Sequence, residues 1–177
     1  LDADVLDSNA LIVARAPVRD EQPAAIEGRW LVLADRGELG RGIADELSRR
    51  GATCVVAVAG ATCGLTAGGE WTLDPAAADG VDRLLAGIGE PLAGVVHCFG
   101  LDATPLDQAS SASLEHDAVL TCGSLLHLTQ ALLRTGSPAR IWVVTRDAVS
   151  AVAGDHVTGT TQAPLWGFGR VVSLEHP

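Results

Sequence analysis

The sequence contains no tyrosine and no lysine, because all 12 residues counted as Lys or Arg are arginines. Any reaction that relies on a tyrosine–lysine pair is therefore excluded for this polypeptide alone. Basic charge is scarce, with 12 basic against 22 acidic residues and a formal net charge of −10. The scattered arginines argue against binding to nucleic acid or to an anionic membrane surface.

Long apolar runs and paired cysteines are missing as well. No stretch approaches the ~18 apolar residues that a membrane-spanning helix needs, and the first residues lack the pattern of a secretion signal. The four cysteines form no CxxC pair, which favours free thiols in a reducing compartment; they are Cys54, Cys63, Cys98 and Cys122. We therefore expect a cytoplasmic protein with no metal site.

The 177 residues, 47% of them apolar, suffice for one domain with a substantial core. Residues 1–28 carry little pattern: 10–16 could be a short strand, and 17–28 has the prolines and charges of a linker. From residue 29 onward, strand-like apolar runs alternate with helical patterns. The expected strands are 30–34, 53–59, 70–73, 93–100 and 139–145. The first expected helix has its apolar stripe at Leu39, Ile43, Ala44 and Leu47 and a stop signal at 49–51, and the later helices are expected at 75–89, 113–136 and 161–176. This alternation predicts an α/β fold over 29–177, a truncated Rossmann-like domain with a doubly wound, mostly parallel sheet.

The stretch "LADRGELGRGIADELSRRG" (33–51) has the layout of a dinucleotide site, in which a strand runs through a glycine-bearing loop into a helix. Glu38, however, brings negative charge to the place of a pyrophosphate. A like-charge pair at ~5 Å and an effective dielectric near 20 costs about 3 kcal/mol. Asp35 and Glu38 also have the spacing of a capping box, with Asp35 at the N-cap and Glu38 reaching back. The helix would then satisfy its own amides without a ligand.

The loop resembles that of the short-chain dehydrogenase/reductase superfamily, which reads Thr-Gly-x-x-x-Gly-x-Gly. Aligned on Gly40, the family's threonine falls on Leu33 and its first two glycines on Ala34 and Glu38. The stretch after the second strand, 59–64, lacks the basic residue that NADPH-dependent members place there. We therefore expect no cofactor in this chain and a degenerate loop formed by Ala34, Asp35, Gly37, Glu38 and Gly40.

The superfamily reduces carbonyls with a Ser-Tyr-Lys set, of which the tyrosine and lysine are absent here. Thr145 follows the strand where the family's serine lies, and either orients a carbonyl or satisfies backbone groups. His97 ends a buried strand and either overlooks the cleft or is structural. His116 and His127 lie three turns apart on one expected helix, too far to share a metal without a third ligand. We predict no catalytic residue.

The last 18 residues, "TTQAPLWGFGRVVSLEHP" (160–177), carry a more specific pattern. They resemble the structural subdomain of ketoreductases in modular type I polyketide synthases, which has the form Ala-Pro-Leu-Trp-Gly-x-Gly-Arg-x-x-x-x-Glu-His-Pro. The resemblance extends over roughly 29–177. It implies a catalytically silent, pseudo-Rossmann half that supports a second half, which binds NADPH and reduces β-ketoacyl groups on acyl carrier protein.

The implied partners are the catalytic ketoreductase half and neighbouring synthase domains, with acyl carrier protein contacted indirectly. In the closing motif, Trp166, Phe168 and Arg170 are expected at the contact with the catalytic half, although these aromatics could instead fill the core. Two other functions stay open. One is a diverged dinucleotide-dependent oxidoreductase that uses Thr145 or His97. The other is a stand-alone interaction module built on a pseudo-reductase fold.

Overall fold

The computed structural model describes residues 25–89, 91–150 and 156–176. The strand expected at 10–16 lies outside these ranges. The described residues form six strands: β1 (Arg29–Ala34), β2 (Thr53–Ala59), β3 (Gly64–Leu65), β4 (Trp71–Leu73), β5 (Leu92–His97) and β6 (Arg140–Val143). They also form five α-helices: α1 (Leu39–Arg49), α2 (Gly80–Ile88), α3 (Ser111–Ala118), α4 (Ser124–Thr135) and α5 (Ala163–Glu175).

The strands form one sheet in the order β3-β4-β2-β1-β5-β6, parallel except for the antiparallel β3–β4 pair. β1 lies between β2 and β5, with Leu33 paired to Ala57 on one side and to His97 on the other. Its three central residues, 31–33, are completely buried because both faces of the sheet are covered there. The predicted doubly wound, mostly parallel fold is confirmed.

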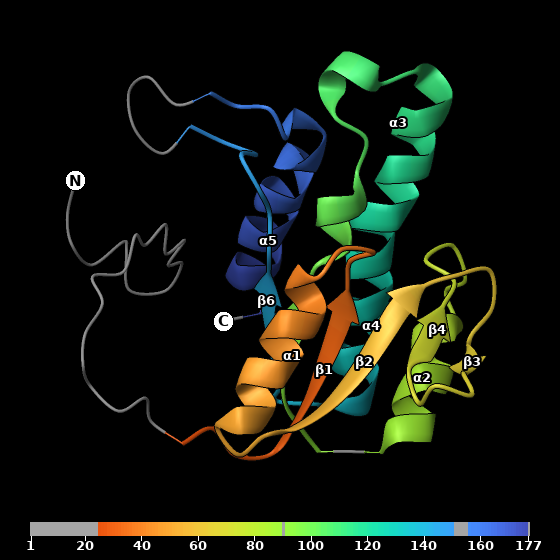
Figure 1. Ribbon diagram of the computed structural model, residues 1–177, viewed down its shortest axis with the longest axis vertical. Helices are drawn as coiled ribbons and strands as arrows, with labels where there is room; N and C mark the ends of the chain where they lie inside the picture. The colour runs from red at the N-terminus through yellow and green to blue at the C-terminus, as the bar shows by residue number, and fades with distance from the viewer. Residues whose placement is uncertain (1–24, 90, 151–155, 177) are drawn as a thin grey trace.

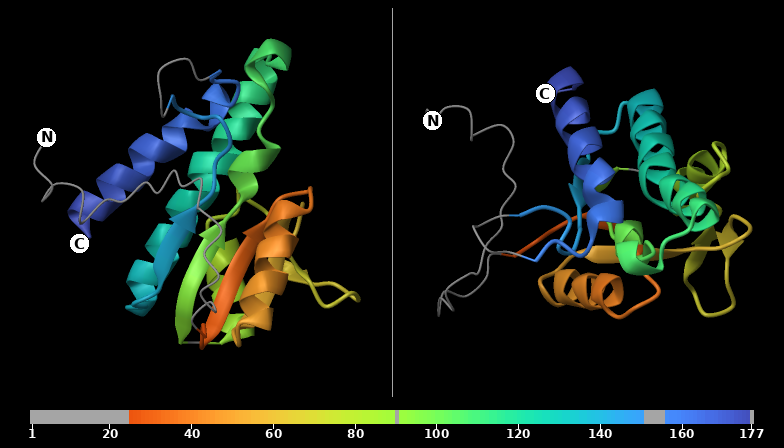
Figure 2. Two further views of the ribbon diagram at one scale, coloured as in Figure 1. Left: turned by 60° about the vertical axis from the view of Figure 1, so that its left-hand side comes forward. Right: turned by 90° about the horizontal axis from the view of Figure 1, so that it is seen from above.

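Helices cover both faces of this sheet (Figures 1 and 2). α1 packs on one face, where Val32, Val96 and Ala44 belong to the smaller core. α2, α4 and α5 cover the other face, where the larger core includes Leu31 and Leu128. No helix within the described ranges is long and apolar enough to cross a membrane.

The helix expected over 113–136 is interrupted by a π turn at Val119–Gly123. Two hydroxyls bond to carbonyls around the interruption: Thr121 Oγ1 donates to Asp117 O at 2.6 Å, and Ser124 Oγ donates to Leu120 O at 2.6 Å. Side chains that compete for backbone carbonyls in this way favour a local change of helical geometry. The end of α4 is as predicted, because Gly136 adopts the left-handed conformation with φ 67°.

Two smaller differences concern the region around β4. The expected loop after β2 contains the two-residue strand β3, and the helix expected from residue 75 begins only at Gly80. Asp74 explains part of the second difference. Its carboxylate accepts the N–H of Ala76 at 2.9 Å. This bond holds the residues that precede α2 in a turn, so the helix starts later than expected.

Candidate functional site

The loop between β1 and α1 meets the ends of β5 and β6 at the carboxyl edge of the sheet, where ligands bind in folds of this kind. A hollow of about 550 Å³ lies there, and seven residues line it: Asp35, Gly37, Glu38, Leu39, Leu101, Asp102 and Arg146. Its lining therefore carries three carboxylates and one guanidinium.

Asp35 supports the start of α1 from inside the protein. It is only 5% exposed, and its Oδ1 accepts the N–H of Gly40 at 2.6 Å. The predicted capping box is nevertheless wrong in detail: Glu38 is the N-cap residue and makes no side-chain cap bond. Asp35 precedes the turn, and its side chain reaches five residues forward to Gly40. Glu38 is itself the N-cap residue, so it does not occupy the third helical position from which a capping-box side chain reaches back. The expected function of Asp35, satisfying a helix amide without a ligand, agrees with this geometry.

The two loop glycines have steric reasons to be present. A Cβ on Gly40 would lie 2.7 Å from the Cα of Ala34 and 3.0 Å from Oδ1 of Asp35. A Cβ on Gly37 would lie 2.6 Å from Oδ2 of Asp35. Packing against the end of β1 and the buried carboxylate thus accounts for both glycines without a bound phosphate.

A second carboxylate, that of Asp102, holds the next loop amide. Asp102 follows β5 and accepts the backbone N–H of Arg36 with both oxygens, at 2.9 and 3.0 Å. Burial raises the pKa of Asp102, the Arg36 N–H opposes this, and the charge of Asp35 adds to it. Asp102 was not predicted from the sequence. The signal for it was an acidic residue shortly after β5, the strand that pairs with β1.

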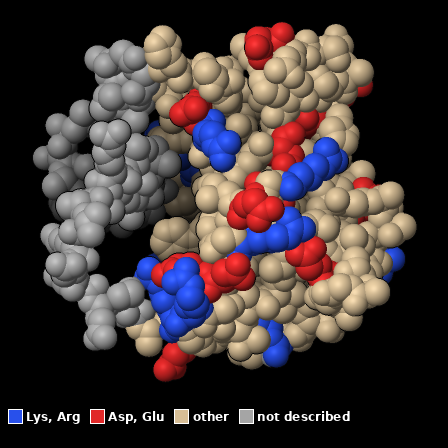
Figure 3. All heavy atoms as spheres, viewed as in Figure 1, with Lys and Arg blue, Asp and Glu red and all other residues tan. Residues whose placement is uncertain are grey.

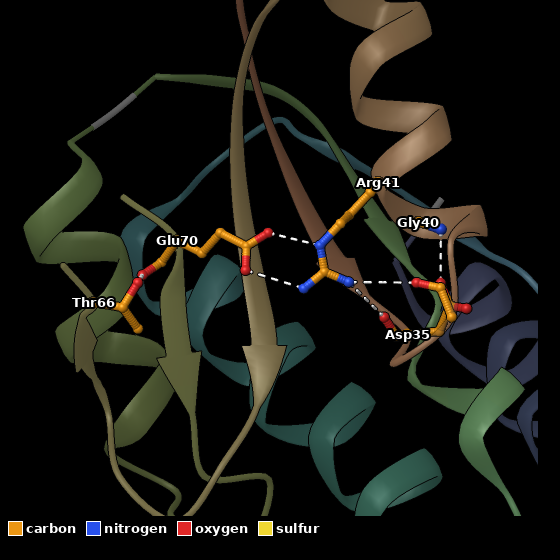
Figure 4. A network of polar contacts seen from close by, with 6 residues as sticks. Asp35, Gly40, Arg41, Thr66 and Glu70 are labelled. Atoms are coloured by element: carbon orange, nitrogen blue, oxygen red, sulfur yellow. Dashed lines mark hydrogen bonds and ion pairs between the residues drawn. The ribbon is translucent and has the colours of Figure 1, made fainter. Parts of the chain in front are cut away.

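The first cation of α1 is also engaged within the chain (Figure 4). Arg41 donates to both carboxylate oxygens of Glu70, at 2.8 and 3.0 Å, and its Nη1 lies 3.3 Å from the carbonyl oxygen of Gly37. The hydrogen bond from Arg41 lowers the pKa of Glu70. Glu70 comes from the segment before β4 and was not predicted. Three donors beside the loop (the N–H groups of Arg36 and Gly40, and the Arg41 guanidinium) therefore all contact carboxylates of the chain.

Of the two alternatives for His97, the structure supports the structural one, because the side chain does not reach the hollow. Alternation along β5 points its side chain toward α4; the ring is completely buried, and Nε2 lies 2.7 Å from Ser124 Oγ. Burial lowers the pKa of His97 to about 4. Thr145 lies just beyond β6 and is partly buried.

His116 and His127 do not come together: His116 is exposed on α3, whereas Nδ1 of His127 lies 3.2 Å from the carbonyl oxygen of Pro75. Among the described residues, no three His, Cys, Asp or Glu side chains are grouped in a way that could hold a metal ion.

The closing motif forms most of α5, whose start is fixed to the strand ends. The buried Gln162 accepts the N–H of Arg146 at 2.9 Å. Phe168 is partly buried and packs against the larger core. Trp166 is also partly buried, and its indole N–H is enclosed without an acceptor among the described residues. The Arg170 guanidinium is exposed and lies 5.8 Å from the centre of the Trp166 ring.

We expect Asp35→Ala to lower the free energy of unfolding by about 1–2 kcal/mol, because it leaves a buried helix amide without its acceptor. Urea unfolding followed by circular dichroism measures this. Asp45→Ala is the matched control, since Asp45 is exposed on the same helix and should change stability by less than about 0.5 kcal/mol. Equal effects of the two substitutions would contradict a capping function for Asp35.

The sheet order, the loop before α1 and the helices on both faces define a Rossmann-like α/β domain. A putative short-chain dehydrogenase from Shigella flexneri shares this fold, with a TM-score of 0.63 and 17% identity over 88% of this chain and 78% of that one. Within this class, the chain belongs to the family described as the Rossmann fold domain of the polyketide synthase extender module SpnB, which matches residues 13–177.

Relatives agree with this assignment. The pikromycin polyketide synthase component PikAII from Streptomyces venezuelae is 35% identical over 174 residues, which are 97% of this chain but 4% of that protein. A solved C2-type ketoreductase from a modular polyketide synthase is 29% identical, with a TM-score of 0.58, over 89% of this chain and 31% of that one. The resemblance to the structural subdomain of a polyketide synthase ketoreductase is thereby confirmed.

Proposed function

We propose that residues 29–177 act as the non-catalytic scaffold half of a polyketide synthase ketoreductase. In this proposal the other half binds NADPH, carries the Ser-Tyr-Lys set and reduces β-ketoacyl groups on acyl carrier protein. The main support is the loop after β1, where the carboxylates of Asp35 and Asp102 hold the N–H groups of Gly40 and Arg36. In nucleotide-binding relatives of this fold, such amides face the phosphates.

The composition and the buried histidine favour this proposal over a diverged oxidoreductase. No tyrosine or lysine occurs among the 177 residues. His97 is enclosed between β5 and α4, so it has no access to a substrate in the hollow. Three of the four charged groups that line the hollow are carboxylates, which repel a dinucleotide rather than bind it.

We expect the isolated chain to bind NADPH negligibly in a calorimetric titration. Glu38→Gly should restore little, because Asp35 and Asp102 would still hold the loop amides and no basic residue follows β2. A complete ketoreductase titrated under the same conditions serves as the positive control. A dissociation constant in the low micromolar range for the unmodified chain would contradict the proposal. Strong binding by the Glu38→Gly variant alone would show that the other two carboxylates are not decisive.

The contact with the catalytic half is proposed to include Trp166 and Arg170. Tryptophan and arginine dominate interface hot spots, so Trp166→Ala and Arg170→Ala should each weaken association with a separately expressed catalytic half by about 2 kcal/mol or more, roughly 30-fold. Calorimetry measures association, and thermal melts of the free chain measure stability. Arg49→Ala, on the charged outer side of α1, is the control. Unchanged affinity together with a large loss of melting temperature would assign both residues to the core.

A further inference from the structure

One edge of the sheet is open at β6. The strand order ends there, so among the described residues no strand pairs with the outer side of β6. Just after β6, the N–H of Val144 donates to the carbonyl oxygen of His97 on β5, at 2.9 Å. Alternate residues of a strand direct their backbone groups to opposite sides. The N–H and C=O groups of Ile141 and Val143 therefore point away from β5, along the outer edge.

β6 lacks the features that protect an edge strand from pairing. Natural sheets shield their edges with proline, lysine, bulges or very short strands. The opposite edge follows this pattern, because β3 has only two residues. β6 has four residues, one charge at its first position, Arg140, and an apolar side chain, Trp142, that is 50% exposed. The outer edge of β6 is therefore suited to receive another strand.

The side chains of β6 are those of a strand with a neighbour on each side. Ile141 and Val143 pack against the larger core, and Val144 packs against the smaller one. Acidic and basic side chains gather instead on the face that α1 covers (Figure 3). β-Branched and aromatic residues are typical of paired strands, and Trp142 would gain contacts from a strand on its free side.

The chain contains a segment of matching chemistry. Residues 10–16 read ALIVARA, of which six of the seven are apolar, and the segment has no proline or glycine. Ile12 and Val13 are β-branched, as strands favour. The segment lies outside the described ranges. The family match covers residues 13–177, so the domain shared by the family begins within this segment and not at β1.

The connection to β1 is long enough to bring this segment to β6. Ile26 donates its N–H to Arg50 O at 2.9 Å, which fixes the described chain at the end of the sheet where β1 begins. A strand beside β6 would lie three strand spacings from β1, about 14 Å. Residues 17–24 can span at most about 26–29 Å. A parallel arrangement would add the length of the segment, about 23 Å, and leave the connection without slack.

We propose that residues 10–16 bind as a strand along the outer edge of β6, antiparallel to it. Their backbone then pairs with the N–H and C=O groups of Ile141 and Val143, and their side chains cover Trp142. This pairing completes the sheet within one chain and does not depend on the scaffold function. A second copy of the chain is less suited to the edge, because each copy brings a formal net charge of −10, which opposes self-association.

Hydrogen exchange of single amides in the full chain tests this pairing. The N–H groups of Ile141 and Val143 should exchange roughly 100-fold more slowly than exposed amides. Of two successive strand residues, one directs its N–H to the partner. Ile12→Pro and Val13→Pro are therefore made separately, and one of them should restore fast exchange because proline has no N–H to donate.

The amide of Val144 is the internal reference, since its bond to His97 O lies on the inner side of the strand. It should stay protected in the unmodified chain and in both variants. Val5→Pro is the matched control, because Val5 precedes the segment, and it should leave every one of these rates unchanged. Nuclear Overhauser contacts between backbone protons of 10–16 and of 141–143 are expected in the unmodified chain.

Fast exchange of Ile141 and Val143 in the unmodified chain would mean that the edge is open, and would refute the proposal. Protection that neither proline variant removes would mean that another strand occupies the edge, which also refutes it. Light scattering that shows a dimer would then identify a second copy as the occupant. If the proline variants fail to fold, the Overhauser contacts decide, because their absence contradicts the pairing without any substitution.

Discussion

Leu165→Ala should lower the free energy of unfolding by about 2–5 kcal/mol, the range measured for truncating a fully buried leucine. Leu165 lies in the first turn of α5, is 1% exposed, and belongs to the larger core. Its Cδ1 lies 2.6 Å from the position that a Cβ on Gly100 would occupy, so the side chain fills the space over the end of β5. The substitution leaves a cavity where α5 is anchored to the strand ends.

Chemical denaturation of the free chain measures this effect, with Leu174→Ala as the control. Leu174 is on the same helix but 73% exposed, so its truncation should change stability by less than about 0.5 kcal/mol. Because α5 carries Trp166 and Arg170, which are proposed to contact the catalytic half, Leu165→Ala should also weaken association with that half. A decrease in the free energy of unfolding of less than about 1 kcal/mol would contradict the conclusion that Leu165 anchors α5 to the strand ends.

His97 should make the fold sensitive to mild acid. Burial lowers its pKa from an ordinary value of 6.5 to about 4. The unfolded chain therefore takes up a proton near pH 6.5, whereas the native chain does so only near pH 4. The native state binds fewer protons in this window, so the free energy of unfolding falls as the pH falls through it. A shift of this size corresponds to about 3 kcal/mol, present in full above pH 6.5 and lost below pH 4.

Urea unfolding at several pH values between 4 and 7 measures this dependence. His97→Gln removes the titrating group and keeps a donor for Ser124, whose own proton is directed to the carbonyls of Leu120 and Thr121. The variant should lose less stability on acidification than the unmodified chain. His116→Gln, at an exposed site, should behave like the unmodified chain. Identical pH profiles for all three would contradict a buried, neutral His97.

The sheet could be predicted because its strands are buried on both faces. The run from Leu31 to Leu33 has no polar residue, and 53–59 was predicted with its observed bounds. Short elements escaped prediction. β3 has two residues, too few for a periodic pattern, and its place depends on pairing with β4. The π turn leaves no periodicity of its own and is visible only through the hydroxyls that bond around it.

The candidate site could be predicted in its chemistry but not in its contacts. The sequence of residues 33–51 alone shows that loop glycines are replaced and that acidic residues stand in the loop. The partner of Arg36 is Asp102, 66 residues later, and the partner of Arg41 is Glu70, 29 residues later. Such pairs arise when the fold brings separate strand ends together, so local spacing cannot identify them. Local spacing also misplaced the cap, because it assumed that the helix would begin directly after Asp35.

The carboxylates of Asp35 and Asp102 also set how the fold responds to its surroundings. A group attached to the same chain is present at an effective concentration that is fixed by geometry and does not vary with the medium. A free ligand stabilises a fold only as its concentration rises above its dissociation constant. The amides of Gly40 and Arg36 are already bonded within the chain. We therefore expect the folded fraction of the protein not to depend on the concentration of nucleotides or phosphate esters. Such a subdomain would fold at the same yield in a starved cell and in a growing one.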